Sequence, residues 1–181
     1  MDEAKLRSDL LELVKQKAMM KGDRTLASGK KSDFYIDGKQ VTLDAQGIFL
    51  TGKIVINMIH GTNADAVGGP IIGADPIVAA VALLSSQSGH PVRAFLVRKE
   101  AKDHGMQKQI EGPPLKKGDR VVVVEDVVTT GASVLKAIKE IEKMHAKVVK
   151  VICLVDREEG ADETLAGYNF SPIFSVRDLK S

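Results

Sequence analysis

Apolar residues recur at helical spacing in some stretches of the chain and form short continuous runs in others. Near the N-terminus, Leu6, Leu10 and Val14 fall on one side of a helix, as in an amphipathic helix. Asp44 is suited to cap a second helix, and Pro76 suits the first turn of a third. The expected helices are residues 3–20, 45–60, 75–86 and 132–144, with a short one near 159–166.

The continuous apolar runs predict strands that are buried on both faces. The expected strands are residues 66–69, 92–97, 120–124 and 147–155, with a last one near 170–176, while residues 26–40 are turn-rich and then strand-like. Because strands alternate with helices, the pattern predicts an α/β fold with a doubly wound, mostly parallel sheet. Residues 1–43 break this alternation. We expect them to form a small N-terminal hood on a single domain whose α/β core is residues 44–181.

The composition limits the classes of partner. The chain of 181 residues has 26 basic and 24 acidic side chains and a net charge of +2, so no strong field points to nucleic acid or an anionic membrane. No apolar run approaches the roughly 18 residues of a membrane span, and the acidic, amphipathic N-terminus is unlike a signal peptide. The absence of Trp argues against stacking on single-stranded nucleic acid. We therefore expect a cytoplasmic protein without nucleic-acid or membrane partners.

The stretch VVVVEDVVTTGAS, residues 121–133, carries the strongest candidate chemistry. Its four valines read as a strand, which places Glu125 and Asp126 at the carboxyl end, where ligands bind in doubly wound sheets. The turn of residues 127–131 then leads into a helix that begins near Ala132. The free amides and the dipole of a helix N-terminus favour a phosphate group, and neighbouring hydroxyl groups add donors.

Two adjacent acids beside a phosphate site suit a ligand that also carries hydroxyl groups. Carboxylates accept hydrogen bonds from a ribose diol, directly or through a hydrated Mg²⁺. The turn can therefore hold a sugar phosphate by both ends. A Walker loop and a dinucleotide fingerprint are excluded, because the patterns GxxxxGK[ST] and GxGxxG are missing here. The remaining alternative is an ordinary strand-to-helix turn with capping threonines and solvated acids.

Residues 98–118 are polar and lack a periodic pattern, which is typical of functional or disordered loops. Four cationic or switchable donors lie close together at its start: Arg98, Lys99, Lys102 and His104. A pyrophosphate group suits such donors, because arginine offers a fork and lysine a point charge. The alternative is a solvated, charged loop without a ligand.

The stretch at 121–133 closely resembles the phosphoribosyl pyrophosphate (PRPP) loop of type I phosphoribosyltransferases: an apolar strand, two acids and Thr-Thr-Gly. Three further segments resemble the orotate branch of this family, in the family's order: LASGKKSDFYIDGKQ (26–40), the mobile-loop segment VRKEAKDHG (97–105) and VDREEGADETL (155–165). The resemblance implies the type I phosphoribosyltransferase fold and a homodimer with shared active sites. It also implies an enzyme of de novo UMP biosynthesis that transfers ribose 5-phosphate from PRPP to orotate, giving orotidine 5′-monophosphate and pyrophosphate.

The resemblance also implies roles for individual residues. Those implied for PRPP are Arg98, Lys99, Lys102, His104, Glu125, Asp126, Val127, Val128, Thr129, Thr130, Gly131, Ala132 and Ser133. Those implied for orotate are Lys31, Phe34, Tyr35, Thr129 and Arg157, the last for the carboxylate. Lys102, His104 and Asp126 are implied as catalytic. Mg²⁺ is implied as a cofactor carried by PRPP, with no direct protein ligand and a water-mediated link to Asp126.

Two alternatives to orotate transfer stay open from the sequence. One is transfer to another base, uracil or a purine, against which Arg157 and the DFY segment favour orotate. The other is a regulator that binds PRPP without catalysis, against which the loop residues Lys102 and His104 favour an enzyme. The chain also departs from the family pattern at Ala27 and at Ile71–Ile72, where relatives carry a lysine.

Overall fold

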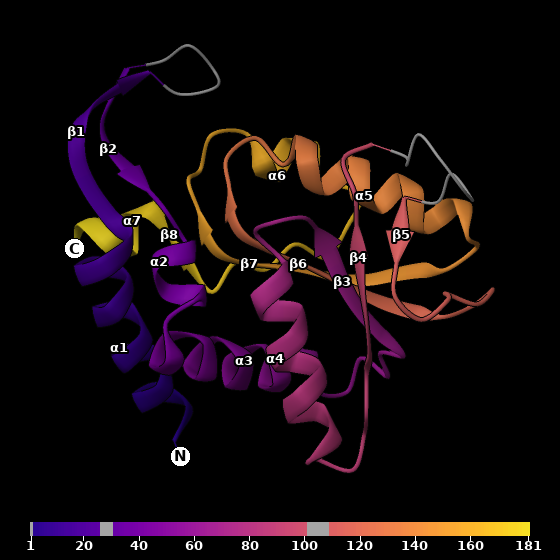
Figure 1. Cartoon of the computed structure of the whole chain (residues 1–181). Coiled ribbons are helices and arrows are strands. Elements are labelled where there is room, and N and C mark those ends of the chain that lie inside the picture. Colours follow the sequence, from indigo (N-terminus) through magenta and orange to yellow (C-terminus); the bar gives the residue numbers. More distant parts are fainter. Residues whose placement is uncertain (1, 26–30, 101–108) are drawn as a thin grey trace.

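The core of the protein is a six-stranded sheet, seen in a computed structural model that describes residues 2–25, 31–100 and 109–181. The strand order is β5-β4-β3-β6-β7-β8 (Figure 1). Its members are β3 (Ala66–Pro70), β4 (Arg93–Val97), β5 (Ile110–Glu111), β6 (Arg120–Val128), β7 (Lys147–Asp156) and β8 (Phe174–Ser175). All neighbouring pairs are parallel except β4–β5. The predicted doubly wound, mostly parallel sheet is confirmed.

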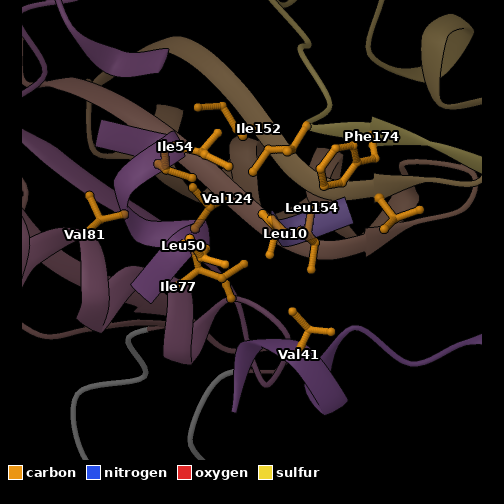
Figure 2. Packing of buried hydrophobic residues seen from close by; sticks show 14 of the residues in the cluster. Leu10, Val41, Leu50, Ile54, Ile77, Val81, Val124, Ile152, Leu154 and Phe174 are labelled. Atoms are coloured by element: carbon orange, nitrogen blue, oxygen red, sulfur yellow. The ribbon is translucent and has the colours of Figure 1, made fainter. Parts of the chain in front are cut away.

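Helices cover both faces of this sheet. The helices α3 (Ala45–Ile59) and α4 (Asp75–Ser86) lie on one face, and α5 (Ala132–Lys143) and α6 (Ala161–Thr164) lie on the other (Figure 1). Successive side chains of a strand point to opposite faces, so the valine run of β6 supplies both layers. Val122 and Val124 pack in the cluster of α3 and α4, where Figure 2 shows Val124, while Val121 and Val123 pack toward α5.

The helix boundaries follow the predicted caps. The Asp44 carboxylate accepts hydrogen bonds from the amides of Gln46 and Gly47, at 3.0 and 2.9 Å, and so begins α3. Pro76 lies in the first turn of α4, where its missing N–H costs no helical hydrogen bond. These two helices therefore start where the sequence predicts.

The N-terminal segment forms a helix and a hairpin. The helix α1 (Glu3–Leu13) continues as a π-helical turn, η1 (Val14–Ala18), and the antiparallel strands β1 (Met19–Thr25) and β2 (Lys31–Ile36) follow. The short α2 (Lys39–Thr42) then leads to α3. Leu6, Leu10 and Val14 are buried in the same cluster as the inner face of α3. The prediction of a helix through residue 20 is wrong at its end, because β1 begins at Met19, and the division into hood and core stays a prediction.

Two strand boundaries also differ from the prediction. The strand β6 runs to Val128 rather than ending near 124, since its pairing with β7 continues as far as Val128–Asp156. The final strand shrinks to β8, because a capping box between Ser175 and Asp178 begins a further helix, α7 (Val176–Lys180). Among the described helices, none has the length and apolar character needed to cross a membrane.

Candidate active site

The candidate site lies where the chain reverses its direction of winding across the sheet. The strand β3 is followed by β4 on one side, and the chain then returns to place β6 on the other. Ligands of doubly wound sheets bind at this switch point, beyond the carboxyl ends of the strands. A cleft of about 1560 Å³ opens there. Its walls include Gly73, Arg98, Lys99, Glu125, Asp126 and Ser133.

The acid pair forms one wall of the cleft although both side chains are nearly buried. Glu125 is 8% exposed and Asp126 is 6% exposed. They lie inside β6 rather than after it, which corrects the predicted position at the strand end. Gly73, in the loop after β3, packs directly on them: a Cβ at this position would lie 2.1 Å from Glu125 Oε1 and 2.3 Å from Asp126 Oδ1. A side chain at residue 73 would therefore displace the acids.

The two carboxylates differ in their electrostatic surroundings. Burial, followed by repulsion from Asp126, raises the pKa of Glu125 well above its ordinary value. Asp126 instead faces a cation, since Lys39 Nζ lies 3.4 Å from Asp126 Oδ2 and 2.8 Å from Asp37 Oδ1. The hydrogen bond to Asp37 raises the pKa of Lys39, so this lysine stays charged beside the acid pair. The two neighbouring acids thus differ: the pKa of Glu125 is raised, whereas Asp126 is paired with a cation.

The turn after β6 leads into α5 and reaches the cleft at Ser133. Gly131 adopts the left-handed conformation with φ of 79° and begins α5 without a side-chain cap. Within the described residues, the amides of Thr129, Thr130, Gly131 and Ser133 donate to no protein acceptor, and the Ala132 amide has only a long contact of 3.5 Å to Thr130 Oγ1. Unpaired amides at a helix N-terminus form an anion site. The predicted phosphate cradle is therefore open.

Cationic side chains also line the cleft. Arg98 and Lys99 follow β4, and the exposed faces of α5 add Lys136, Lys139 and Lys143. Some of this charge is offset locally, because Arg98 Nη1 lies 3.7 Å from Glu111 and Lys143 pairs with Glu140 at 2.7 Å. The predicted loop residues Lys102 and His104 lie outside the described residues, so their position relative to this cleft stays a prediction.

Arg157 is held rigidly at the carboxyl end of β7. Its side chain is buried, its amide donates to the Val128 carbonyl at 2.9 Å, and its Nε donates to Glu159 Oε1 at 2.9 Å. The Phe34 ring of β2 lies 5.5 Å from its guanidinium carbon. Its sequence neighbour Asp156 is buried and accepts a hydrogen bond from the Glu158 amide.

The structure thus assembles two groups of predicted residues. Glu125, Asp126, Val127 and Ser133 meet Arg98 and Lys99 around the cleft, and Arg157 meets Phe34 beside the end of β6. Tyr35 alternates with Phe34 along β2, and the Lys31 side chain lies outside the described part of the chain. Val128 has a buried side chain, which leaves only its backbone for a ligand. Sequence reasoning missed Lys39 and Gly73, whose roles depend on contacts with β6 that no local pattern signals.

Comparison with known proteins identifies the family of this chain. The sequence profile of the phosphoribosyl transferase domain matches residues 48–174. Orotate phosphoribosyltransferase from Nostoc sp. is 44% identical over 181 residues, covering 99% of this chain and 87% of the relative. The chain belongs to the orotate phosphoribosyltransferase family. Another member of this family, from Aquifex aeolicus, is 45% identical over 176 residues and covers 96% of this chain and 95% of its own.

A solved structure of an orotate phosphoribosyltransferase has the same fold. The enzyme from Mycobacterium tuberculosis, crystallised in complex with PRPP, superposes with a TM-score of 0.80 and 32% sequence identity. The match covers 97% of this chain and 99% of the other. The predicted type I phosphoribosyltransferase fold and enzyme class are therefore confirmed.

Proposed function

We propose that this chain transfers ribose 5-phosphate from PRPP to orotate, giving orotidine 5′-monophosphate and pyrophosphate. The observation that carries the proposal is the largely unpaired set of amides at Thr129–Ser133, which follows the acid pair of β6. The amides can donate to the 5-phosphate of PRPP, and the two acids can accept from its ribose hydroxyl groups. Family membership supports the same reaction.

The residues around the turn would bind the sugar phosphate at both ends. Thr129, Thr130, Gly131, Ala132 and Ser133 hold the 5-phosphate through amides and hydroxyl groups, with the dipole of α5 adding to the attraction. Glu125 and Asp126 accept from the ribose hydroxyl groups. This grip fixes the reacting C1 of the ribose, and such positioning lowers the barrier before any proton moves.

Charge must be offset as the pyrophosphate departs and C1 becomes cationic. Arg98 and Lys99 already line the cleft, and we propose that Lys102 and His104 join them at the leaving group. Fixed donors aimed at developing charge are the largest single source of rate in many enzymes. Asp126 lies beside the ribose in this arrangement, where a carboxylate stabilises positive charge at C1.

Orotate would bind at Arg157 and Phe34. The Glu159 carboxylate occupies the Nε side of Arg157, and within the described residues its terminal nitrogens donate to no protein acceptor. A carboxylate can therefore take both terminal nitrogens in the bidentate geometry that arginine favours. The Phe34 ring offers a flat face to the pyrimidine, and Thr129, Tyr35 and Lys31 complete the proposed contacts.

The donor set suits a magnesium ion carried by the substrate. The described residues contain no cluster of three or more ligating side chains, so this part of the chain offers no cage for a metal by itself. Mg²⁺ typically keeps its waters and binds one or two carboxylates together with substrate phosphates. Asp126, which lines the cleft, fits this role through a water molecule. The ion would offset charge on the pyrophosphate.

We further propose a cytoplasmic homodimer with shared active sites and without nucleic-acid or membrane partners. The modest net charge of +2 supports the last point. Size-exclusion chromatography would test the homodimer, and mixed-subunit kinetics would test the sharing of active sites.

A direct test follows orotate absorbance in a mixture of protein, Mg²⁺ and PRPP. Turnover with orotate, and little with uracil, adenine or guanine, is the expected result. The absence of turnover at high enzyme concentration would overturn the proposal. A preference for another base would retain phosphoribosyl transfer and reject orotate as the substrate.

A further inference from the structure

The C-terminal helix α7 contacts both segments that are proposed to hold the base. It follows β8, which pairs with β7 at Val155–Phe174 and Asp156–Ser175, next to Arg157. Figure 1 shows α7 beside the foot of the β1–β2 hairpin, from which Phe34 comes. Leu179 is buried in the main core cluster and the Ser175–Asp178 capping box fixes the first turn. The helix is therefore anchored, although it is only a few residues long.

One contact of α7 reaches the turn that carries Arg157. Arg177 Nε lies 3.0 Å from Glu158 Oε2. Glu158 adopts a left-handed backbone with φ of 57°, and its amide is held by Asp156 Oδ1 at 2.9 Å. Since Arg177 is well exposed, this pair contributes little energy. It shows instead that α7 lies against the turn.

The second contact places a positive charge on the Phe34 ring. Lys180 Nζ lies 4.4 Å from the ring centroid, inside the range of a cation–π interaction. Arg157 lies 5.5 Å from the same centroid. Two cations from elements far apart in the sequence therefore lie near one aromatic side chain. Glu159 neutralises Arg157 in part, whereas Lys180 pairs with no carboxylate within the described residues.

We propose that Lys180 is a positioning and specificity residue for the base subsite, which it serves by orienting Phe34 and by adding a second positive charge for an anionic base. The inference rests on the proposed function, because orotate is anionic at neutral pH whereas uracil is neutral. A second cation beside Arg157 favours the anionic base over the neutral one. The charge acts through Phe34 and through space, so Lys180 needs no direct contact with the substrate.

The test compares Lys180→Met and Lys180→Arg with the wild type in steady-state kinetics. For Lys180→Met we expect the KM for orotate to rise about twofold to fivefold, the range of an exposed cation–π contact. The kcat and the KM for PRPP should stay unchanged, and inhibition by uracil should stay equally weak. Lys180→Arg should restore the wild-type KM, because it keeps the charge.

The matched control is Lys53→Met. Lys53 lies 5.8 Å above the Phe49 ring on α3, outside the segments proposed to bind substrate, so its loss should leave both KM values unchanged. An unchanged KM for orotate in Lys180→Met would overturn the inference. So would equal losses in affinity for orotate and uracil, since they would indicate a purely structural role. The wild-type measurements test the proposed function separately. If the wild type neither converts orotate nor binds it in calorimetry, the proposed function fails.

Discussion

Replacing Gly73 by alanine tests whether the placement of the acid pair controls activity. The new Cβ would lie 2.1 Å from Glu125 Oε1, 2.3 Å from Asp126 Oδ1 and 2.9 Å from Asp126 Cγ. Ordinary contact begins near 3.4 Å, so the nearest carboxylate oxygen must retreat by about 1.3 Å. Both acids are nearly buried, which leaves them little room to turn aside.

The cost to stability and the cost to activity should separate in this variant. Overpacking of a buried site costs about 1–3 kcal/mol, and each kcal/mol lowers the Tm of a protein of this size by about 2–4 °C. The folded protein therefore survives. Misplacing a catalytic group by about 1 Å costs on the order of a hundredfold in rate. We expect kcat/KM for PRPP to fall by about that factor.

The assay measures kcat/KM from orotate absorbance at a temperature well below the lowered Tm. Gly167→Ala is the matched control, because a Cβ at residue 167 meets nothing within 4 Å. It should leave both Tm and kcat/KM unchanged. The reasoning is refuted if Gly73→Ala keeps wild-type kcat/KM, or if its activity falls only in proportion to the fraction unfolded.

Three further predictions concern an acid, a helix cap and the loop. Burial and Asp126 raise the pKa of Glu125 above its ordinary 4.5. Above pH 4.5 the folded state therefore binds a proton that the unfolded chain releases. The free energy of unfolding then falls as the pH rises from 4.5 through the folded pKa. Glu125→Gln should therefore melt at a higher temperature than wild type at pH 8 and lose this advantage by pH 4.5; a constant difference would contradict the assignment. Asp44→Ala removes two amide hydrogen bonds at the start of α3 and should cost about 1 kcal/mol, or about 2–4 °C in calorimetry, with activity intact. Lys102→Ala should lower kcat roughly tenfold to a thousandfold, and an unchanged kcat would remove Lys102 from the mechanism.

The parts of the fold that the sequence predicts depend on local chemistry. Asp44 and Pro76 identify helix starts because capping and the missing proline N–H act within one turn. The valine run of β6 identifies a central strand because both of its faces must be apolar. The Thr129–Ser133 segment could be interpreted as a strand-to-helix turn for the same reason, since strand, turn and helix follow one another directly along the chain.

The parts that the sequence does not predict depend on contacts between distant segments. The strand β1 contains MMKGDRT, which has neither an alternating pattern nor an apolar run, and it forms because β2 pairs with it. Lys39 reaches Asp126, and Gly73 packs on Glu125, only once the sheet is assembled. Arg157 similarly finds Glu159 rather than its neighbour Asp156, since the left-handed Glu158 turns the chain between them.

The hydrogen bond from the Arg157 amide to the Val128 carbonyl links the two halves of the proposed site through the main chain. The arginine proposed to bind the base and the turn proposed to bind the phosphate follow adjacent paired strands, whose spacing of about 4.8 Å is common to all sheets. The backbone therefore sets the distance between the arginine and the turn, whatever side chains they carry. Substitutions after β7 can then exchange one nucleobase for another while the ribose phosphate stays where it was. A scaffold of this kind can diversify its acceptor without rebuilding its donor site.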